Sequence, residues 1–177
     1  MPQQPSTDSE DILALIDFAA IADAGDKLRE CEFFLELAAA ESGRERFRWL
    51  ITAYLNAVYS YFETSALAAS VGITDPQTGE PVEDSEAVDR LRAYVKVFQD
   101  AKNPYYVKTG GLHPVIQRLY KVRAAATHHF PLSIMATGPN LPEDYEFGST
   151  KGQGTNVLAL CREAMEVVKQ VQAELDS

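Results

Sequence analysis

The chain has 177 residues, 46% of them apolar and 24% charged, a balance typical of one globular domain and not of a fibrous or disordered polymer. It has no run of 18 apolar residues and no basic, apolar leader, so we expect a cytoplasmic protein with no membrane-spanning helix and no membrane partner. Its formal net charge of −10 argues against indiscriminate binding to nucleic acid.

The first part of the chain predicts a flexible tail followed by three helices. Residues 1–8 are interpreted as the tail, and residues 9–177 as a single domain. Ser9 is placed to cap a first helix that ends near Ala24, where Gly25 is expected to break it. A second helix is predicted over 27–42 and a third, the longest, over 44–71. The apolar stripe of the first helix consists of Ile12, Leu15, Ile16 and Ala19.

The second part predicts three more helices and one irregular stretch. Loops over 72–84 and 103–113 flank a helix at 85–99, and Pro114 suits the first position of a helix that ends near His129. Residues 133–136 and 145–147 are expected to pair as a short hairpin or to form an irregular flap. Thr155 or Asn156 then caps a last helix. The sequence therefore predicts an all-α, antiparallel bundle of about five to six helices with a small flap before the last one.

The two cysteines, Cys31 and Cys161, lie far apart within apolar helical stripes. We interpret both as buried thiols, because a disulfide framework needs a secreted context. No Cys/His spacing resembles a zinc site, so no metal or cofactor is expected.

Positive charge is concentrated between Arg90 and Phe130, where eight Lys or Arg residues accompany one acid, Asp100. Such a segment on an acidic protein can attract a polyanion to one place. The alternative is that these residues are spread over two helices and two loops and form no patch.

All three histidines, at positions 113, 128 and 129, lie in this positive segment. His128 and His129 fall in the last turn of the predicted helix, whose dipole favours an imidazolium. Arg123 lies five residues before His128, which is roughly 140° around an ideal helix. The two side chains would meet only at a frayed helix end or across a dimer axis.

The spacing Arg123-x4-His128 at the end of a late helix resembles the HEPN family (higher eukaryotes and prokaryotes nucleotide-binding). The aromatic helix from Phe47 to Ser60 and the helix around Cys31–Leu37 are similar to helices of that family. The resemblance covers residues 27–131. It implies a homodimeric, metal-independent endoribonuclease, in which a guanidinium holds phosphate and an imidazole transfers protons. The implied catalytic residues are Arg123, His128 and His129, and the implied RNA-binding residues are Lys102, Lys108, Arg118 and Lys121.

Two positions depart from the family pattern. Active members commonly carry a polar residue after the motif arginine, where this chain has Ala124, and Phe130 replaces the tyrosine of nucleotide-modified members. One alternative is therefore a non-catalytic module of the same type that binds a nucleotide, an RNA or a regulatory protein. The other is a structural bundle, in which Arg123 pairs with an acid such as Glu63 and His128 caps helix carbonyls.

Overall fold

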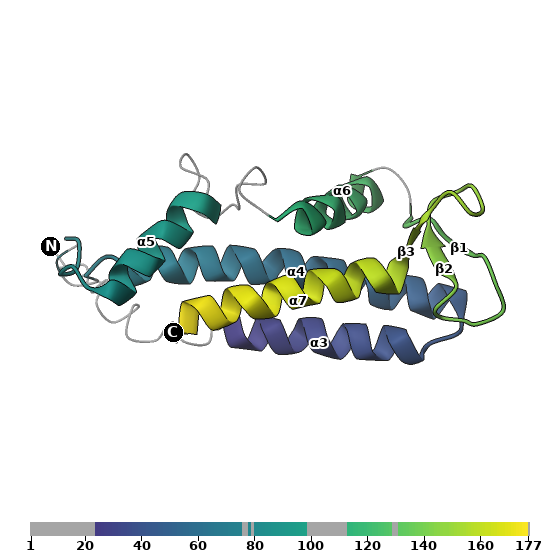
Figure 1. Cartoon of the computed structure of the whole chain (residues 1–177), viewed down its shortest axis with the longest axis horizontal. Helices are drawn as coiled ribbons and strands as arrows, with labels where there is room; N and C mark the ends of the chain where they lie inside the picture. The colour runs from purple at the N-terminus through teal and green to yellow at the C-terminus, as the bar shows by residue number, and fades with distance from the viewer. Residues whose placement is uncertain (1–23, 76–77, 79, 99–112, 129–130, 177) are drawn as a thin grey trace, which may run out of the picture.

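The computed structural model describes residues 24–75, 78, 80–98, 113–128 and 131–176. Within this part of the chain it is mostly helical, with one small antiparallel sheet (Figure 1). The predicted all-α bundle with a short flap is therefore confirmed. Its helices are α3 (Ala24–Ala40), α4 (Arg44–Gly72), α5 (Glu86–Phe98), α6 (Pro114–His128) and α7 (Val157–Asp176), and its strands are β1 (Ile134–Ala136), β2 (Tyr145–Phe147) and β3 (Thr155–Asn156).

The helices pack around α4, which spans 29 residues and so extends over roughly 43 Å. Helix α3 packs along it as the other arm of a hairpin, α7 packs against α3 and α6, and α6 also lies along α4. Figure 1 shows α5 at one end of the bundle and the sheet at the other. The site discussed below lies where α6 meets α4.

Aromatic residues of α4 fill the core, as its apolar stripe predicts. Phe47, Tyr54, Tyr61 and Phe62 are fully buried. The hydroxyl of Tyr54 donates a hydrogen bond of 2.7 Å to the carbonyl oxygen of Cys161 in α7. A buried polar group needs such a partner, so this bond fixes how α7 sits against α4.

The predicted break at Gly25 is wrong, because Gly25 lies inside α3. It occupies the first turn, where backbone N–H groups lack partners within a helix, and a glycine there costs at most about 1 kcal/mol. The same helix ends at Ala40 and not at Ser42. The predicted tail and the predicted first helix lie outside the described residues, apart from Ala24.

The starts of α5, α6 and α7 agree with the sequence. The hydroxyl of Ser85 accepts a hydrogen bond from the N–H of Val88, Pro114 is the first residue of α6, and Asn156 accepts from the N–H of Ala159. These are the interactions of capping residues and of a proline in the first turn. The loop predicted over 103–113 lies outside the described residues except for His113.

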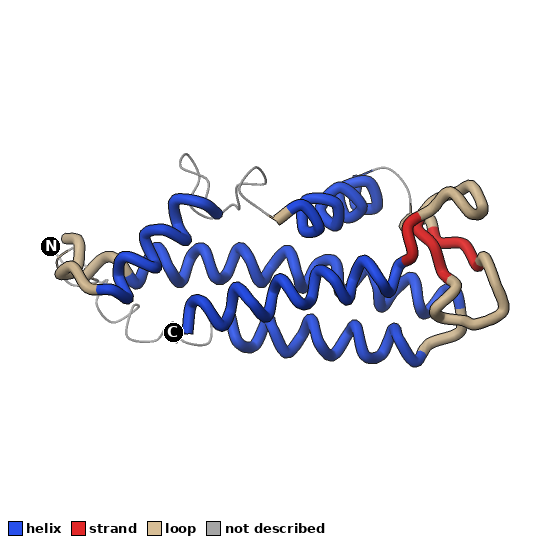
Figure 2. Tube along the Cα trace, in the orientation of Figure 1, coloured by secondary structure: helices blue, strands red, loops and turns tan. Residues whose placement is uncertain are grey.

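The predicted hairpin is present and has a third strand. Strand β1 pairs antiparallel with β2, placing Ile134 opposite Phe147, and β2 pairs antiparallel with β3 (Figure 2). We had interpreted Thr155 and Asn156 only as a helix cap. The ring of Tyr145 lies 4.4 Å from that of Phe47, and its hydroxyl donates to the carbonyl of Ser42. The sheet is therefore attached to the α3–α4 hairpin.

Both cysteines are buried and free, as expected. Burial raises the pKa of the Cys31 thiol to about 12, and it also raises the pKa of Cys161. A thiol with a raised pKa stays protonated and unreactive at neutral pH. No described helix has the length and apolar character that crossing a membrane requires.

Candidate functional site

Arg123 projects from α6 onto one face of α4. Its Nε donates a hydrogen bond of 2.8 Å to Oδ1 of Asn56. Its guanidinium carbon lies 3.9 Å from the centre of the Tyr59 ring, which is a cation–π contact. Tyr59 thus contacts the face of the guanidinium, and Asn56 binds one edge of it. The side chain of Arg123 is half-buried.

Glu63 lies one turn beyond Tyr59 on the same helix, close to Arg123. Partial burial raises the pKa of Glu63, while a hydrogen bond from Tyr59 and the positive charge of Arg123 act in the opposite direction. The carboxylate is therefore near a cation and yet incompletely solvated, which makes its ionised form more costly than usual. In the structural alternative, Arg123 pairs with an acid such as Glu63. The proximity of these two residues agrees with that alternative.

Tyr120 closes the inner side of this cluster. Its ring centroid lies 4.9 Å from that of Tyr59, and its side chain is buried. Burial raises the pKa of its hydroxyl, which therefore stays protonated. Among the described residues this hydroxyl has no hydrogen-bond partner. The cluster therefore extends from the half-buried guanidinium of Arg123 to the buried hydroxyl of Tyr120.

The sequence contained a signal for Asn56 that we did not use. Residues 56, 59 and 63 are spaced by three and four, so they share one face of α4. Tyr59 follows the apolar pattern of α4, whereas Asn56 is polar and exposed. A polar side chain among long apolar runs on a central helix is a candidate for contact with a neighbouring element.

His128 lies in the last turn of α6, as predicted, and follows Arg123 by five positions. Its side chain, and all of His129, lie outside the described part of the structure. Ala124, which follows Arg123, is exposed. The backbone therefore puts the motif arginine and the motif histidine in the last two turns of one helix.

Arg118 and Lys121, two predicted phosphate ligands, are exposed on α6 but do not join the Arg123 cluster. Nη2 of Arg118 lies 3.4 Å from Oγ1 of Thr155, so it reaches toward the sheet while Arg123 reaches toward α4. Lys121 is two residues from Arg123, or roughly 200° around the helix. The other two predicted ligands, Lys102 and Lys108, lie outside the described residues.

Part of the positive segment is neutralised by acids that precede it in the sequence. Arg90 pairs with Glu86 at 3.4 Å, and Arg92 pairs with Asp84 and Asp89. The positive segment was defined as starting at Arg90, so its charge count left out the three acids that precede it. In α5, therefore, the two arginines form ion pairs within the protein.

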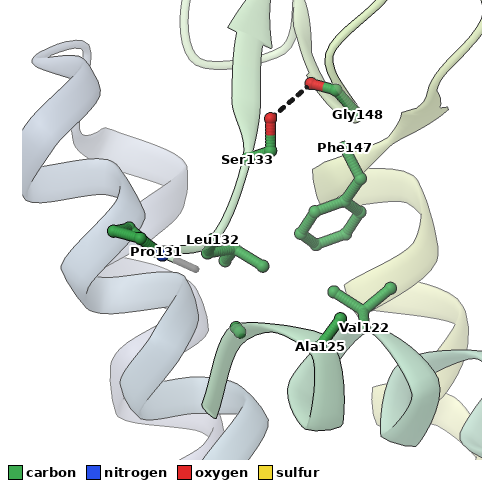
Figure 3. Close-up of a pocket in the computed structure, with 8 residues that line it drawn as sticks. Val122, Ala125, Pro131, Leu132, Ser133, Phe147 and Gly148 are labelled. Atoms are coloured by element: carbon green, nitrogen blue, oxygen red, sulfur yellow. Dashed lines mark hydrogen bonds between the residues drawn. The ribbon is translucent and has the colours of Figure 1, made fainter. Parts of the chain in front are cut away.

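A cavity of about 550 Å³ lies between the end of α6 and the sheet (Figure 3). Figure 3 shows Val122, Leu132 and Phe147 pointing toward one another across it. The hydroxyl of Ser133 donates to the carbonyl of Gly148, whose N–H donates back to the carbonyl of Ser133. Ser133 and Gly148 are thus paired with each other, and most of the residues that line the cavity are apolar.

No cluster of three or more His, Cys, Asp or Glu residues in the described part of the chain is arranged to hold a metal ion. No known family model, curated protein or solved structure matches the chain.

Proposed function

We propose that this protein is a HEPN-like module that binds RNA, with Arg123 as the ligand of a backbone phosphate. The observation that carries the proposal is the fixed orientation of the guanidinium between Asn56 and Tyr59. A guanidinium pairs with phosphate through parallel N–H groups, so its plane decides which approach is productive. Fixing that plane before binding lowers the conformational entropy lost on binding.

Glu63 modulates this site. Its carboxylate lies near the guanidinium, so an incoming phosphate must compete with it for Arg123. Removing the negative charge while keeping the shape, as in Glu63→Gln, is therefore expected to tighten RNA binding. Arg123→Ala, which removes the guanidinium, is expected to abolish specific RNA binding at this site.

The second candidate function is metal-independent RNA cleavage, favoured by the position of His128 at the end of the helix that carries Arg123. In this reaction one imidazole takes the proton of the 2′-hydroxyl, whose oxygen bonds to the adjacent phosphorus. The bond from phosphorus to the 5′-oxygen breaks, and a second imidazole, in its protonated form, gives its proton to that oxygen. The guanidinium stabilises the charge on the pentavalent phosphate. We propose that two copies of the chain form a homodimer in which both Arg123–His128 pairs face one groove.

The test is incubation of the pure protein with labelled single-stranded RNA in the presence of EDTA, with binding and cleavage followed separately. RNA binding that weakens with salt and is lost in Arg123→Ala supports the proposal. Lys151→Ala is the matched control, because it removes an exposed cation that lies outside α6 and has no proposed role in RNA binding. Binding lost equally in both variants would indicate unspecific attraction.

Cleavage is assigned to His128 only if it survives EDTA and disappears in His128→Ala while RNA binding remains. If the wild-type protein does not bind RNA, and Arg123→Ala and His128→Ala only lower the melting temperature, the structural alternative is correct. Sedimentation of the wild-type chain with and without RNA tests the proposed homodimer.

A further inference from the structure

The α3–α4 hairpin exposes four large apolar side chains, of which Val71 lies at the far end of α4 and the other three nearer the turn of the hairpin. Phe33 is 55% exposed and Leu37 is 42% exposed, and their spacing of four places both on one face of α3. Trp49 of α4 is 59% exposed. We call Phe33, Leu37 and Trp49 the outer apolar face.

Leu37 and Trp49 lie at the same height of the hairpin. Arg46 pairs with Glu41 at 3.0 Å across the turn that joins α3 to α4. Leu37 precedes Glu41 by one helical turn, and Trp49 follows Arg46 by almost one turn. Helix α7 packs on another side of α3, through Lys169 and Glu32, and leaves this face open.

The segment that precedes α3 has the composition needed to cover such a face. Between Ile12 and Ile21 it carries six large apolar residues in ten positions. Ile12, Leu15, Ile16 and Ala19 form the predicted helical stripe. Exposure of so much apolar surface to water is unfavourable, at roughly 1.5–3 kcal/mol for each large side chain.

The length of this segment matches the distance it has to span. It ends at Ala24, the first residue of α3, and Phe33 and Leu37 lie nine and thirteen residues further on. These separations correspond to roughly 14 and 20 Å along the helix axis, and a helix of fifteen residues extends over about 22 Å. A reversal of the chain at about residue 23 would lay the segment antiparallel along α3.

We propose that residues 9–23 dock as an amphipathic helix on the outer apolar face. The covalent link supplies an effective concentration in the millimolar range or above, so a modest intrinsic affinity is enough. Docking of this segment does not depend on RNA binding, because Arg123 lies elsewhere, at the contact between α4 and α6.

The test uses the fluorescence of Trp49, the only tryptophan of the chain. The full-length wild-type chain is compared with the full-length double variant Ile12→Asp/Ile16→Asp, which makes the stripe polar. In the variant, the emission of Trp49 is expected to shift to longer wavelength and its quenching by acrylamide to increase. Gln3→Asp/Gln4→Asp is the matched control, since it adds the same charge outside the stripe and should leave Trp49 protected.

A second reporter tests the contact with α3 directly. In a Trp49→Phe background, Phe33→Trp places the fluorophore on α3, and the same increase in quenching is expected when Ile12 and Ile16 become aspartate. Equal quenching with the wild-type and altered segments at this reporter would overturn the proposal. Protection that persists in the altered segment and increases with protein concentration would assign the face to a second copy, and would also overturn it.

Discussion

The guanidinium of Arg123 lies on the ring of Tyr59, and this contact joins two helices that are far apart in the sequence. Asn56 completes the arrangement from one turn away on α4. The pair therefore serves two purposes in the proposed function. It fixes α6 against α4, and it orients the group that would meet a phosphate.

Tyr59→Leu is expected to weaken RNA binding by about two- to fivefold, because a cation–π contact at a partly exposed site contributes about 0.5–1 kcal/mol. Tyr59→Phe keeps the ring and removes only the hydroxyl that bonds Glu63, so its affinity should stay at or above that of the wild type. Fluorescence anisotropy with a labelled RNA measures both. Equal losses in the two variants would show that the hydroxyl matters and the stacked ring does not.

Asn56 and Arg123 should be coupled in a double-mutant cycle. Asn56→Ala and Arg123→Ala each remove one partner of the hydrogen bond, and the double variant should be more stable than the sum of the two losses predicts. The expected coupling is roughly 0.5–1.5 kcal/mol in the free energy of unfolding by urea, within the range of a single hydrogen bond. Additive losses would mean that the bond contributes nothing to stability.

The raised pKa of Glu63 makes the stability of the protein depend on pH. A group with a higher pKa in the folded state contributes stability that is complete below its unfolded pKa and is lost as the pH rises through its folded pKa. Glu63→Gln, which resembles the protonated form, should therefore unfold at a higher temperature than the wild type at pH 7. The difference should shrink as the pH falls to about 4, near the ordinary pKa of glutamate.

Scanning calorimetry at several pH values between these limits measures that difference. Glu143→Gln is expected to change the stability in the opposite direction, because the hydrogen bond from Arg162 lowers the pKa of Glu143. This variant should be no more stable than the wild type at pH 7. A gain from Glu63→Gln that stayed the same at every pH would rule out titration of Glu63 as its cause.

Two buried tyrosines should respond differently to loss of their hydroxyl groups. Tyr54→Phe removes the hydrogen bond to Cys161 and should cost about 1 kcal/mol. Tyr120→Phe removes a buried hydroxyl that has no partner among the described residues, so it should be neutral or stabilising. Urea unfolding separates the two. A clear loss of stability in Tyr120→Phe would indicate that its hydroxyl has a partner.

Helices with a long apolar stripe were predictable from the sequence because burial of that stripe determines them. The helices α4 and α7 agree with the prediction to within one residue at their starts, where Gly43 and Asn156 precede them. Gly25 was misread because the cost of one glycine is small compared with the packing of a whole helix. Strand β3 is only two residues long and pairs through its backbone, so it leaves no periodic pattern to read.

The candidate site was only half predictable. The sequence singled out Arg123 through its spacing to His128 at the end of a late helix, which resembles a family motif. It could not reveal that Asn56 and Tyr59 receive the guanidinium, since that depends on how α6 is rotated and shifted along α4. The count of charges also could not distinguish Arg118, which reaches toward the sheet, from Arg123, which reaches toward α4.

The pairing of α7 with α3 has a consequence for synthesis on the ribosome. Residues Val157 to Val171 contribute eight buried side chains, and Lys169 reaches back to Glu32 near the start of the described chain. Until this last helix leaves the exit tunnel, the hydroxyls of Tyr54 and Tyr61 lack their acceptors Cys161 and Gln172, and the nascent chain exposes the apolar surface that α7 later covers. A premature stop before Val157 should therefore yield an aggregating product and not a smaller working protein.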